Sequence, residues 1–255
     1  MQLAGQTFLI VGGCSGLGEA CVREFAAAGA HVVVADVKDA VPPSLTADFG
    51  SQIAFRRTDV TNTADVESVL DDTYARFQSL QGVVQCAGII GAARLAGHAG
   101  PHDMELFRQV VEVNLVGTFN VMRLAAQRMK LNPLQATGER GVIVNTASVS
   151  AFEGQIGQVA YSASKGGVAS MTLPAARELA AHGIRVVSVA PGAFQTPMID
   201  AVPIRVQQSL RDQAVFPSRL GEPAEFAKLV RHIVENQMLN GCVIRLDGAV
   251  RMGAK

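Results

Sequence analysis

A tyrosine and a lysine, Tyr161 and Lys165, stand four residues apart, and a serine, Ser148, precedes them. On a helix, residues at this spacing share one face about one turn apart, so the phenol and the amine would lie side by side. A fixed positive charge favours tyrosinate and lowers a phenol pKa that is about 10 when unperturbed. Such a phenol can take a proton from a substrate oxygen or return it, and a serine hydroxyl can hold the same oxygen. Because the pair also occurs by chance on helix surfaces, its weight depends on a second motif.

The segments around these residues would place them at the edge of a sheet. Residues 141–146 are apolar and β-branched, which predicts a buried strand. Good helix formers from Gln158 onward predict a helix to about His182, in which Pro174 is the only breaker. Ser148 would follow the carboxyl end of the strand, where open α/β sheets bind their ligands.

The second motif is a glycine-rich turn near the start of the chain. An apolar strand over residues 7–11 runs into Gly12, Gly16 and Gly18, and an amphipathic helix follows over residues 19–28. A strand, a glycine turn and a helix form the context that phosphate binding requires, because glycine permits close backbone approach and the helix offers free N–H groups. The alternative is a plain strand-to-helix turn.

An acidic residue ends the next strand. Residues 31–35 are apolar, and Asp36 follows them about 20 residues beyond the glycine turn, where a carboxylate accepts the adenosine ribose hydroxyls of a dinucleotide. The same carboxylate would repel a 2′-phosphate. Val37, not a basic residue, comes directly after it, so the sequence favours NAD over NADP, although Lys38 lies close.

The remaining segments continue the alternation of strands and helices, which predicts an α/β fold: a single-domain, Rossmann-type, doubly wound parallel sheet of about seven strands, over residues 1–255. A substrate flap is expected over about residues 193–220. Asp103 and either Thr61 or Asn62 are expected helix caps. Further strands are predicted over residues 51–58, 82–86, 184–190 and 242–246, and helices over 61–79, 104–131 and 224–235.

Composition narrows the class of protein. Of 255 residues, 49% are hydrophobic and 17% are charged, which suits a sheet covered on both faces. The 22 basic and 22 acidic residues balance, so a nucleic-acid surface is not expected. The four cysteines and five histidines lack metal-ligand spacing, so no metal is expected. Neither a signal peptide nor an apolar run of about 18 residues is visible, which predicts a cytoplasmic protein without a membrane partner.

Taken together, Gly12-x-x-x-Gly16-x-Gly18, Asn114, Ser148 and Tyr161-x-x-x-Lys165 resemble the short-chain dehydrogenase/reductases over the whole chain. A closer resemblance is to the type II 3-hydroxyacyl-CoA dehydrogenases, a group that includes 17β-hydroxysteroid dehydrogenase type 10 and the 2-methyl-3-hydroxybutyryl-CoA dehydrogenases. The segments that carry it are residues 145–167, 216–225 and 239–249.

This resemblance implies NAD-dependent, reversible oxidation of the 3-hydroxyl of an acyl-CoA by a homotetramer, in fatty acid metabolism or branched-chain amino acid degradation. Tyr161 would be the general acid/base. Lys165 would lower its pKa and hold the nicotinamide ribose, Ser148 would orient the substrate oxygen, and Asn114 would position a water that passes protons through Lys165.

The resemblance also implies the residues that bind NAD and substrate. Those expected at the cofactor, besides the glycines, Tyr161 and Lys165, are Ser15 and Leu17 at the pyrophosphate, Asp36 at the ribose, Asp59 and Val60 at the adenine, Cys86, Ala87 and Gly88 along the cleft, and Pro191, Gly192, Phe194 and Thr196 at the nicotinamide. Those expected at the substrate are Ser148, Gln155 and Tyr161.

Some positions depart from the family pattern. Val11 replaces a usual threonine, and Gln85-Cys86 replaces Asn-Asn or Asn-Cys; residues at these positions mostly brace the turn and the sheet, so the changes are expected to affect local stability more than catalysis. The loop over residues 91–101 is expected to be shorter than in the animal members, so the substrate preference does not transfer with the motifs.

Three functions therefore stay open. The first is an NAD-linked 3-hydroxyacyl-CoA dehydrogenase, in which Arg205, Arg211 and Arg219 of the flap could meet CoA phosphates or simply be solvated. The second is a dehydrogenase of a steroid or another secondary alcohol, with the same catalytic residues and a different mouth. The third is a nucleotide-binding scaffold without activity, for which the glycine turn and Asp36 alone would suffice.

Overall fold

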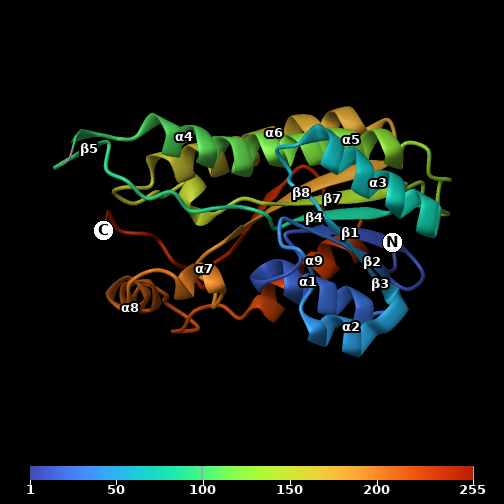
Figure 1. Cartoon of the computed structure of the whole chain (residues 1–255), viewed down its shortest axis with the longest axis horizontal. Coiled ribbons are helices and arrows are strands. Elements are labelled where there is room, and N and C mark those ends of the chain that lie inside the picture. The colour runs from blue at the N-terminus through green and yellow to red at the C-terminus, as the bar shows by residue number, and fades with distance from the viewer. Residues whose placement is uncertain (99, 255) are drawn as a thin grey trace.

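A computed structural model describes residues 1–98 and 100–254 of the chain. Seven parallel strands form one sheet in the order β3-β2-β1-β4-β7-β8-β9 (Figure 1). The order reverses direction between β1 and β4, which defines a doubly wound sheet and confirms the predicted fold class. The strands are β1 (Thr7–Val11), β2 (His31–Asp36), β3 (Ile53–Arg57), β4 (Gly82–Gln85), β7 (Gly141–Thr146), β8 (Ile184–Pro191) and β9 (Val243–Leu246).

Helices cover both faces of the sheet (Figure 1). On one face lie α1 (Gly16–Ala27), α2 (Pro43–Phe49) and α9 (Pro223–Glu235); on the other lie α3 (Thr63–Phe77), α4 (Met104–Val111), α5 (Thr118–Met129) and α6 (Val159–Ala180). The smaller elements are the hairpin β5 (Ala96–Gly97) and β6 (Gly100–Pro101), two short helices, α7 (Pro197–Asp200) and α8 (Ile204–Asp212), and 3₁₀ turns at Gly50–Gln52 and Val149–Ala151.

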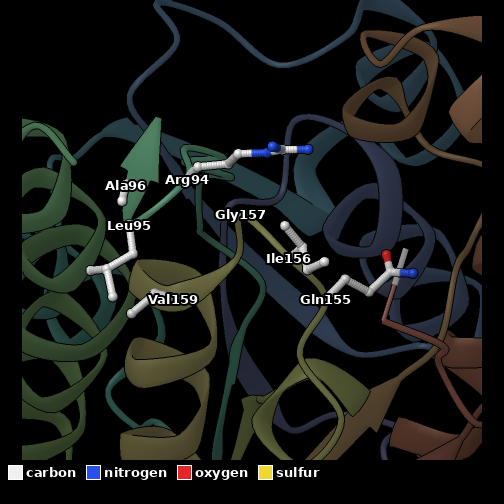
Figure 2. Close-up of a pocket in the computed structure, with 7 residues that line it drawn as sticks. All are labelled: Arg94, Leu95, Ala96, Gln155, Ile156, Gly157 and Val159. Carbon is white, nitrogen blue, oxygen red and sulfur yellow. The ribbon is translucent and has the colours of Figure 1, made fainter. Parts of the chain in front are cut away.

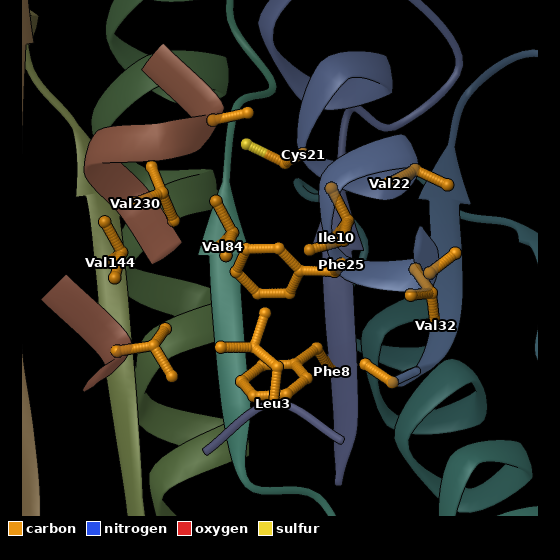
Figure 3. Close-up of a cluster of buried hydrophobic side chains, with 14 of the residues drawn as sticks. Leu3, Phe8, Ile10, Cys21, Val22, Phe25, Val32, Val84, Val144 and Val230 are labelled. Atoms are coloured by element: carbon orange, nitrogen blue, oxygen red, sulfur yellow. The ribbon is translucent and has the colours of Figure 1, made fainter. Parts of the chain in front are cut away.

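Alternation along β1 shows how the sheet separates two cores. Phe8 and Ile10 point toward α1 and α9, where Phe8 meets Phe25 edge to face at 4.8 Å (Figure 3). Leu9 and Val11 point the other way, into the core beneath α3, α5 and α6. Because successive side chains of a strand face opposite sides, a strand that is apolar throughout must be covered twice.

The predicted helix over residues 104–131 is wrong as a single α-helix. It consists of α4, a π-helical segment from Glu112 to Gly117 and α5. Asn114 lies in the π-helical segment, and such segments widen a helix locally, often at functional sites. The poor helix formers Asn114 and Gly117 were the local signals of this interruption in the sequence.

Other local predictions agree with the structure. Asn62, not Thr61, caps α3 by accepting the N–H groups of Ala64 and Asp65, and Asp103 caps α4. Pro174 lies inside α6 without ending it. No helix of the described residues is both long and apolar enough to cross a membrane.

Candidate active site

The glycine turn meets the end of β4 at the reversal point of the sheet. Gly12 has φ +75°, and a Cβ there would lie 2.6 Å from the backbone nitrogen of Ala87. A Cβ on Gly18 would overlap the carbonyl oxygen of Gly12. Glycine is therefore required at both positions, and the turn brings the amino end of α1 to the carboxyl edge of the sheet. Ser15 precedes the first turn of α1 without capping it by its side chain, so the N–H groups there keep their capacity for an anion.

Asp36 lies beside this turn and is 8% exposed. Its Oδ2 accepts the backbone N–H of Cys14 at 2.9 Å, and its Oδ1 accepts that of Lys38 at 3.1 Å. The Lys38 ammonium reaches the carbonyl oxygen of Cys14 at 3.4 Å. The carboxylate thus ties β2 to the glycine turn and retains acceptor capacity, with a lysine next to it.

Further residues expected at the cofactor lie at the ends of β3 and β4. Asp59 accepts the backbone and side-chain donors of Thr61 at 2.9 and 2.8 Å, and Val60 is buried. A hydrogen bond with the Cys21 thiol is the main cause that lowers the pKa of the Cys86 thiol. Burial raises the pKa of the Cys21 thiol. Gln85 braces the sheet, because its amide donates to Asn145 at 2.9 Å and to the Thr118 carbonyl at 3.1 Å.

Ser148, Tyr161 and Lys165 come together just beyond the carboxyl end of β7. The Lys165 nitrogen lies 5.9 Å from the centroid of the Tyr161 ring, and Ser148 is close enough for its hydrogen bonding to affect the phenol. Lys165 is buried, 4% exposed, and donates to the carbonyl oxygen of Thr146 at 2.7 Å.

Burial dominates the protonation of both groups. It lowers the pKa of Lys165 to about 8. It raises the pKa of Tyr161, and hydrogen bonding with Ser148 opposes only part of that rise. The amine of Lys165 donates to Thr146, and the expectation that it lowers the Tyr161 pKa stays a prediction.

Asn114 anchors the wall next to Lys165. Its side-chain oxygen accepts the N–H of Ile89 at 2.8 Å, and its amide nitrogen donates to the Ile89 carbonyl at 2.9 Å and to Ser164 Oγ at 3.1 Å. A Cβ on Gly88 would lie 3.1 Å from the Asn114 oxygen and 3.5 Å from the Lys165 nitrogen. Asn114 in the π-helical segment therefore holds the loop after β4 against α6, and both polar atoms of its side chain are hydrogen-bonded.

The turn after β8 packs against the glycine turn. Thr196 lies against Gly16, where a Cβ would be 3.2 Å from its methyl group. The N–H of Gly192 donates to Leu246, and Pro191 is buried at the end of β8. Phe194 differs from the others, because its ring is buried against Phe226 in the core. The side chain of Phe194 is therefore part of the core, and only its backbone remains to contact a ligand at the sheet edge.

Gln155 lies apart from Tyr161, on a neighbouring pocket of about 420 Å³ (Figure 2). Leu95, Ile156 and Val159 give this pocket an apolar wall, and Arg94 extends over it. Val159 is two residues before Tyr161 on α6, so the pocket adjoins the residues described above. The described residues contain no group of three or more side chains that could hold a metal ion.

Sequence reasoning missed three contributors to this site. The carbonyl group of Thr146 aims Lys165, the hydroxyl of Ser164 joins Asn114 to α6, and the backbone of Ile89 receives both ends of the asparagine amide. Two of these contributions come from backbone atoms, which no residue type reveals. Ser164 carries a signal only in its position next to Lys165.

The fold and the site define an α/β protein with a nucleotide-type glycine turn and a serine, tyrosine and lysine at one sheet edge. The family model described as short chain dehydrogenase matches residues 6–205. The chain belongs to this family, and it is an oxidoreductase that acts on CH–OH groups.

Known relatives resemble the chain over nearly its full length. It is 48% identical to 3-hydroxyacyl-CoA dehydrogenase type-2 of Bos taurus, with 98% of this chain and 97% of that one covered. It is 47% identical to the protein of the same name from Drosophila melanogaster, with 96% of both chains covered. The crystal structure of 3-hydroxyacyl-CoA dehydrogenase type-2 from Mycobacterium avium matches with a TM-score of 0.93 at 37% identity, with both chains fully covered.

Proposed function

We propose that this protein is an NAD-dependent dehydrogenase that reversibly oxidises the 3-hydroxyl of a 3-hydroxyacyl-CoA to a 3-ketoacyl-CoA. The observation that carries the proposal is the convergence of Ser148, Tyr161 and Lys165 beside the glycine turn. The substrate class is supported by relatives that bear this activity in their names at 47–48% identity. NAD, when bound, supplies the nicotinamide that accepts the hydride from C3.

The chain's residues fit this cofactor. Gly12 and Gly18 let the turn pack directly against Ala87 and against the start of α1, and the free N–H groups of α1 suit a pyrophosphate. Asp36 retains acceptor capacity for ribose hydroxyls and would repel a 2′-phosphate. Thr196 faces the turn from the opposite side, where it can fix the nicotinamide half.

Proton transfer would then fall to Tyr161. In the direction of ketone reduction, its phenol donates a proton to the substrate oxygen that Ser148 holds, and the raised pKa keeps the phenol protonated beforehand. In the direction of oxidation the phenol must first lose this proton, and the phenolate then takes the proton of the substrate hydroxyl as the hydride leaves C3. Lys165, with a pKa of about 8, can exchange protons near neutral pH and would pass this one on. Asn114 supports the relay by position, because it fixes Gly88 and Ile89 next to the amine.

Removal of the phenolic hydroxyl tests the catalytic part. Tyr161→Phe should lower kcat by about a thousandfold, since a general acid/base contributes roughly 10²–10⁴ in rate. NAD binding, followed by calorimetry, should persist, which also distinguishes an enzyme from a nucleotide-binding scaffold. Unchanged turnover in the variant would remove Tyr161 from its role.

The substrate class needs a separate measurement. A panel of 3-hydroxyacyl-CoA thioesters of several lengths, steroids and simple secondary alcohols should give NADH formation chiefly with the thioesters. The apolar wall of Leu95, Ile156 and Val159 suits an acyl chain. Reduction of NAD with steroids or alcohols and with no thioester would replace the acyl-CoA assignment by the alternative dehydrogenase.

We also propose that the protein is a homotetramer. Val116 and Phe119, at the junction of the π-helical segment and α5, are 41% and 51% exposed, and Leu173 on α6 is 43% exposed. Large apolar side chains exposed on the same helical layer suit burial by another subunit. Sedimentation velocity should give a tetramer, and Phe119→Asp should shift it toward smaller species.

A further inference from the structure

A polar groove of about 630 Å³ lies between α8 and the C-terminal segment. From α8 it is lined by Arg205, Gln208, Ser209 and Asp212, which recur at the three- and four-residue spacing of one helix face. Figure 1 shows α8 and the C-terminus at the same end of the molecule. The C-terminal segment contributes Arg251 and Gly253, and Gln213 follows α8.

The structure separates the three flap arginines that the sequence could not rank. Arg219 is held by both carboxylate oxygens of Glu225 at 2.8 Å, and this pairing lowers the pKa of Glu225 to about 2. Arg211 lies off the groove face of α8 and reaches only Gln195, at 3.5 Å. Arg205 makes no hydrogen bond or ion pair with any described residue and lines the groove.

Arg251 faces Arg205 from the C-terminal segment and keeps much of its charge available. It approaches Glu153 at 3.5 Å and Asp247 at 3.4 Å, but Arg245 holds the same two carboxylates at 2.8 and 2.7 Å. Its side chain is 64% exposed. Two guanidinium groups therefore border one groove, with the Asp212 carboxylate as the opposing charge.

A short strap connects this groove to the catalytic serine. Gly253 accepts from the Gln155 amide at 3.3 Å and donates to Gln213 at 3.4 Å. The preceding residue, Met252, accepts from Ser150 at 3.9 Å, and the Ser150 N–H donates to Ser148 Oγ at 3.1 Å. The groove thus lies on the outer side of the segment whose inner side adjoins Ser148.

We propose that this groove binds the phosphates of the CoA moiety, with Arg205 and Arg251 as the anion-binding residues. Guanidinium groups match phosphate geometry, and Gln208 and Ser209 add neutral donors beside them. The pantetheine arm of the same substrate would cross the strap to the reacting carbon. This inference rests on the proposed acyl-CoA activity and locates the part of the substrate that does not react.

The test compares two thioesters that share the reacting group. Acetoacetyl-CoA carries the phosphates, whereas acetoacetyl-pantetheine lacks them, and both are reduced at saturating NADH. Arg205→Ala and Arg251→Ala should each raise KM for acetoacetyl-CoA by about five- to tenfold, the size expected for one charged hydrogen bond at a partly exposed site. KM for acetoacetyl-pantetheine and both kcat values should stay unchanged.

Matched variants sharpen the result. Arg211→Ala removes the same charge from the other face of α8 and should leave both KM values near wild type. Asp212→Asn removes the opposing carboxylate and should lower KM for acetoacetyl-CoA by about twofold. Salt should raise KM for the CoA thioester alone, and this dependence should weaken in Arg205→Ala.

Two outcomes overturn the inference in distinguishable ways. If wild type reduces both thioesters but Arg205→Ala and Arg251→Ala affect them equally or not at all, the phosphates bind elsewhere and the proposed function stands. If wild type reduces neither thioester while it turns over another alcohol or ketone, the proposed function fails and the groove assignment fails with it.

Discussion

The two sides of the cleft are built differently. On the cofactor side, Asp36 and Asn114 are buried and bonded to backbone, and glycines bring chain segments into direct contact. On the side proposed for the substrate, large apolar side chains are exposed, such as Leu95 next to the hairpin and Ile204 on α8. The side proposed for NAD is therefore fixed by close packing, while the other side is a surface that can vary with the substrate.

One substitution made on both sides tests this contrast most strongly. Gly18→Ala should destabilise the protein by about 4 kcal/mol, at the upper end for a single change, and abolish NAD binding, because the new methyl group overlaps the Gly12 carbonyl. Gly97→Ala in the hairpin meets nothing closer than 3.4 Å and should change stability by less than about 0.5 kcal/mol. Urea unfolding and calorimetry measure both. Equal effects at the two sites would abolish the distinction.

The hydrogen bonds between Asn114 and Ile89 should give the next largest effect on stability. Asn114→Ala strands the N–H and C=O of Ile89 and should cost about 3 kcal/mol in the free energy of unfolding. Gln155→Ala on the substrate side loses one 3.3 Å bond and should cost less than about 1 kcal/mol. Chemical denaturation of the two variants measures these costs. If Asn114→Ala lowered the free energy of unfolding by no more than Gln155→Ala, the loop after β4 would not be rigidly held by Asn114.

Burial of Lys165 predicts a pH dependence of stability. Burial lowers the pKa of Lys165 from its ordinary value of 10.5 to about 8 in the folded chain, so between these values the unfolded state binds more protons and stability rises with pH. From pH 8 to pH 10 this contribution should grow by about 2 kcal/mol. The stability difference between wild type and Lys165→Met, measured in urea without cofactor, should shift in favour of wild type by that amount. A difference that stays constant across this range would show that the amine is solvated.

Much of the architecture followed from local pattern. Apolar strand runs bounded by glycine or acidic residues located every strand of the large sheet, because strands covered on both faces must be apolar throughout. The break in the 104–131 helix escaped prediction, since α and π geometry differ by one hydrogen-bond register and residue types barely report it. The α2 helix and the small hairpin also carried too little periodicity to be recognised.

The tyrosine–lysine spacing, the glycine turn and Asp36 are local patterns, so the side chains that could do chemistry were recognisable along the chain. The protonation and the contacts of these side chains depend on three-dimensional packing. Burial raises the pKa of Tyr161 and lowers that of Lys165. The amide of Asn114 binds the loop after β4, which is distant in the sequence. Arg205 of the flap lines a groove, whereas Arg219 is paired with Glu225. Desolvation and long-range contacts depend on which segments meet in space, and no spacing along the chain records that.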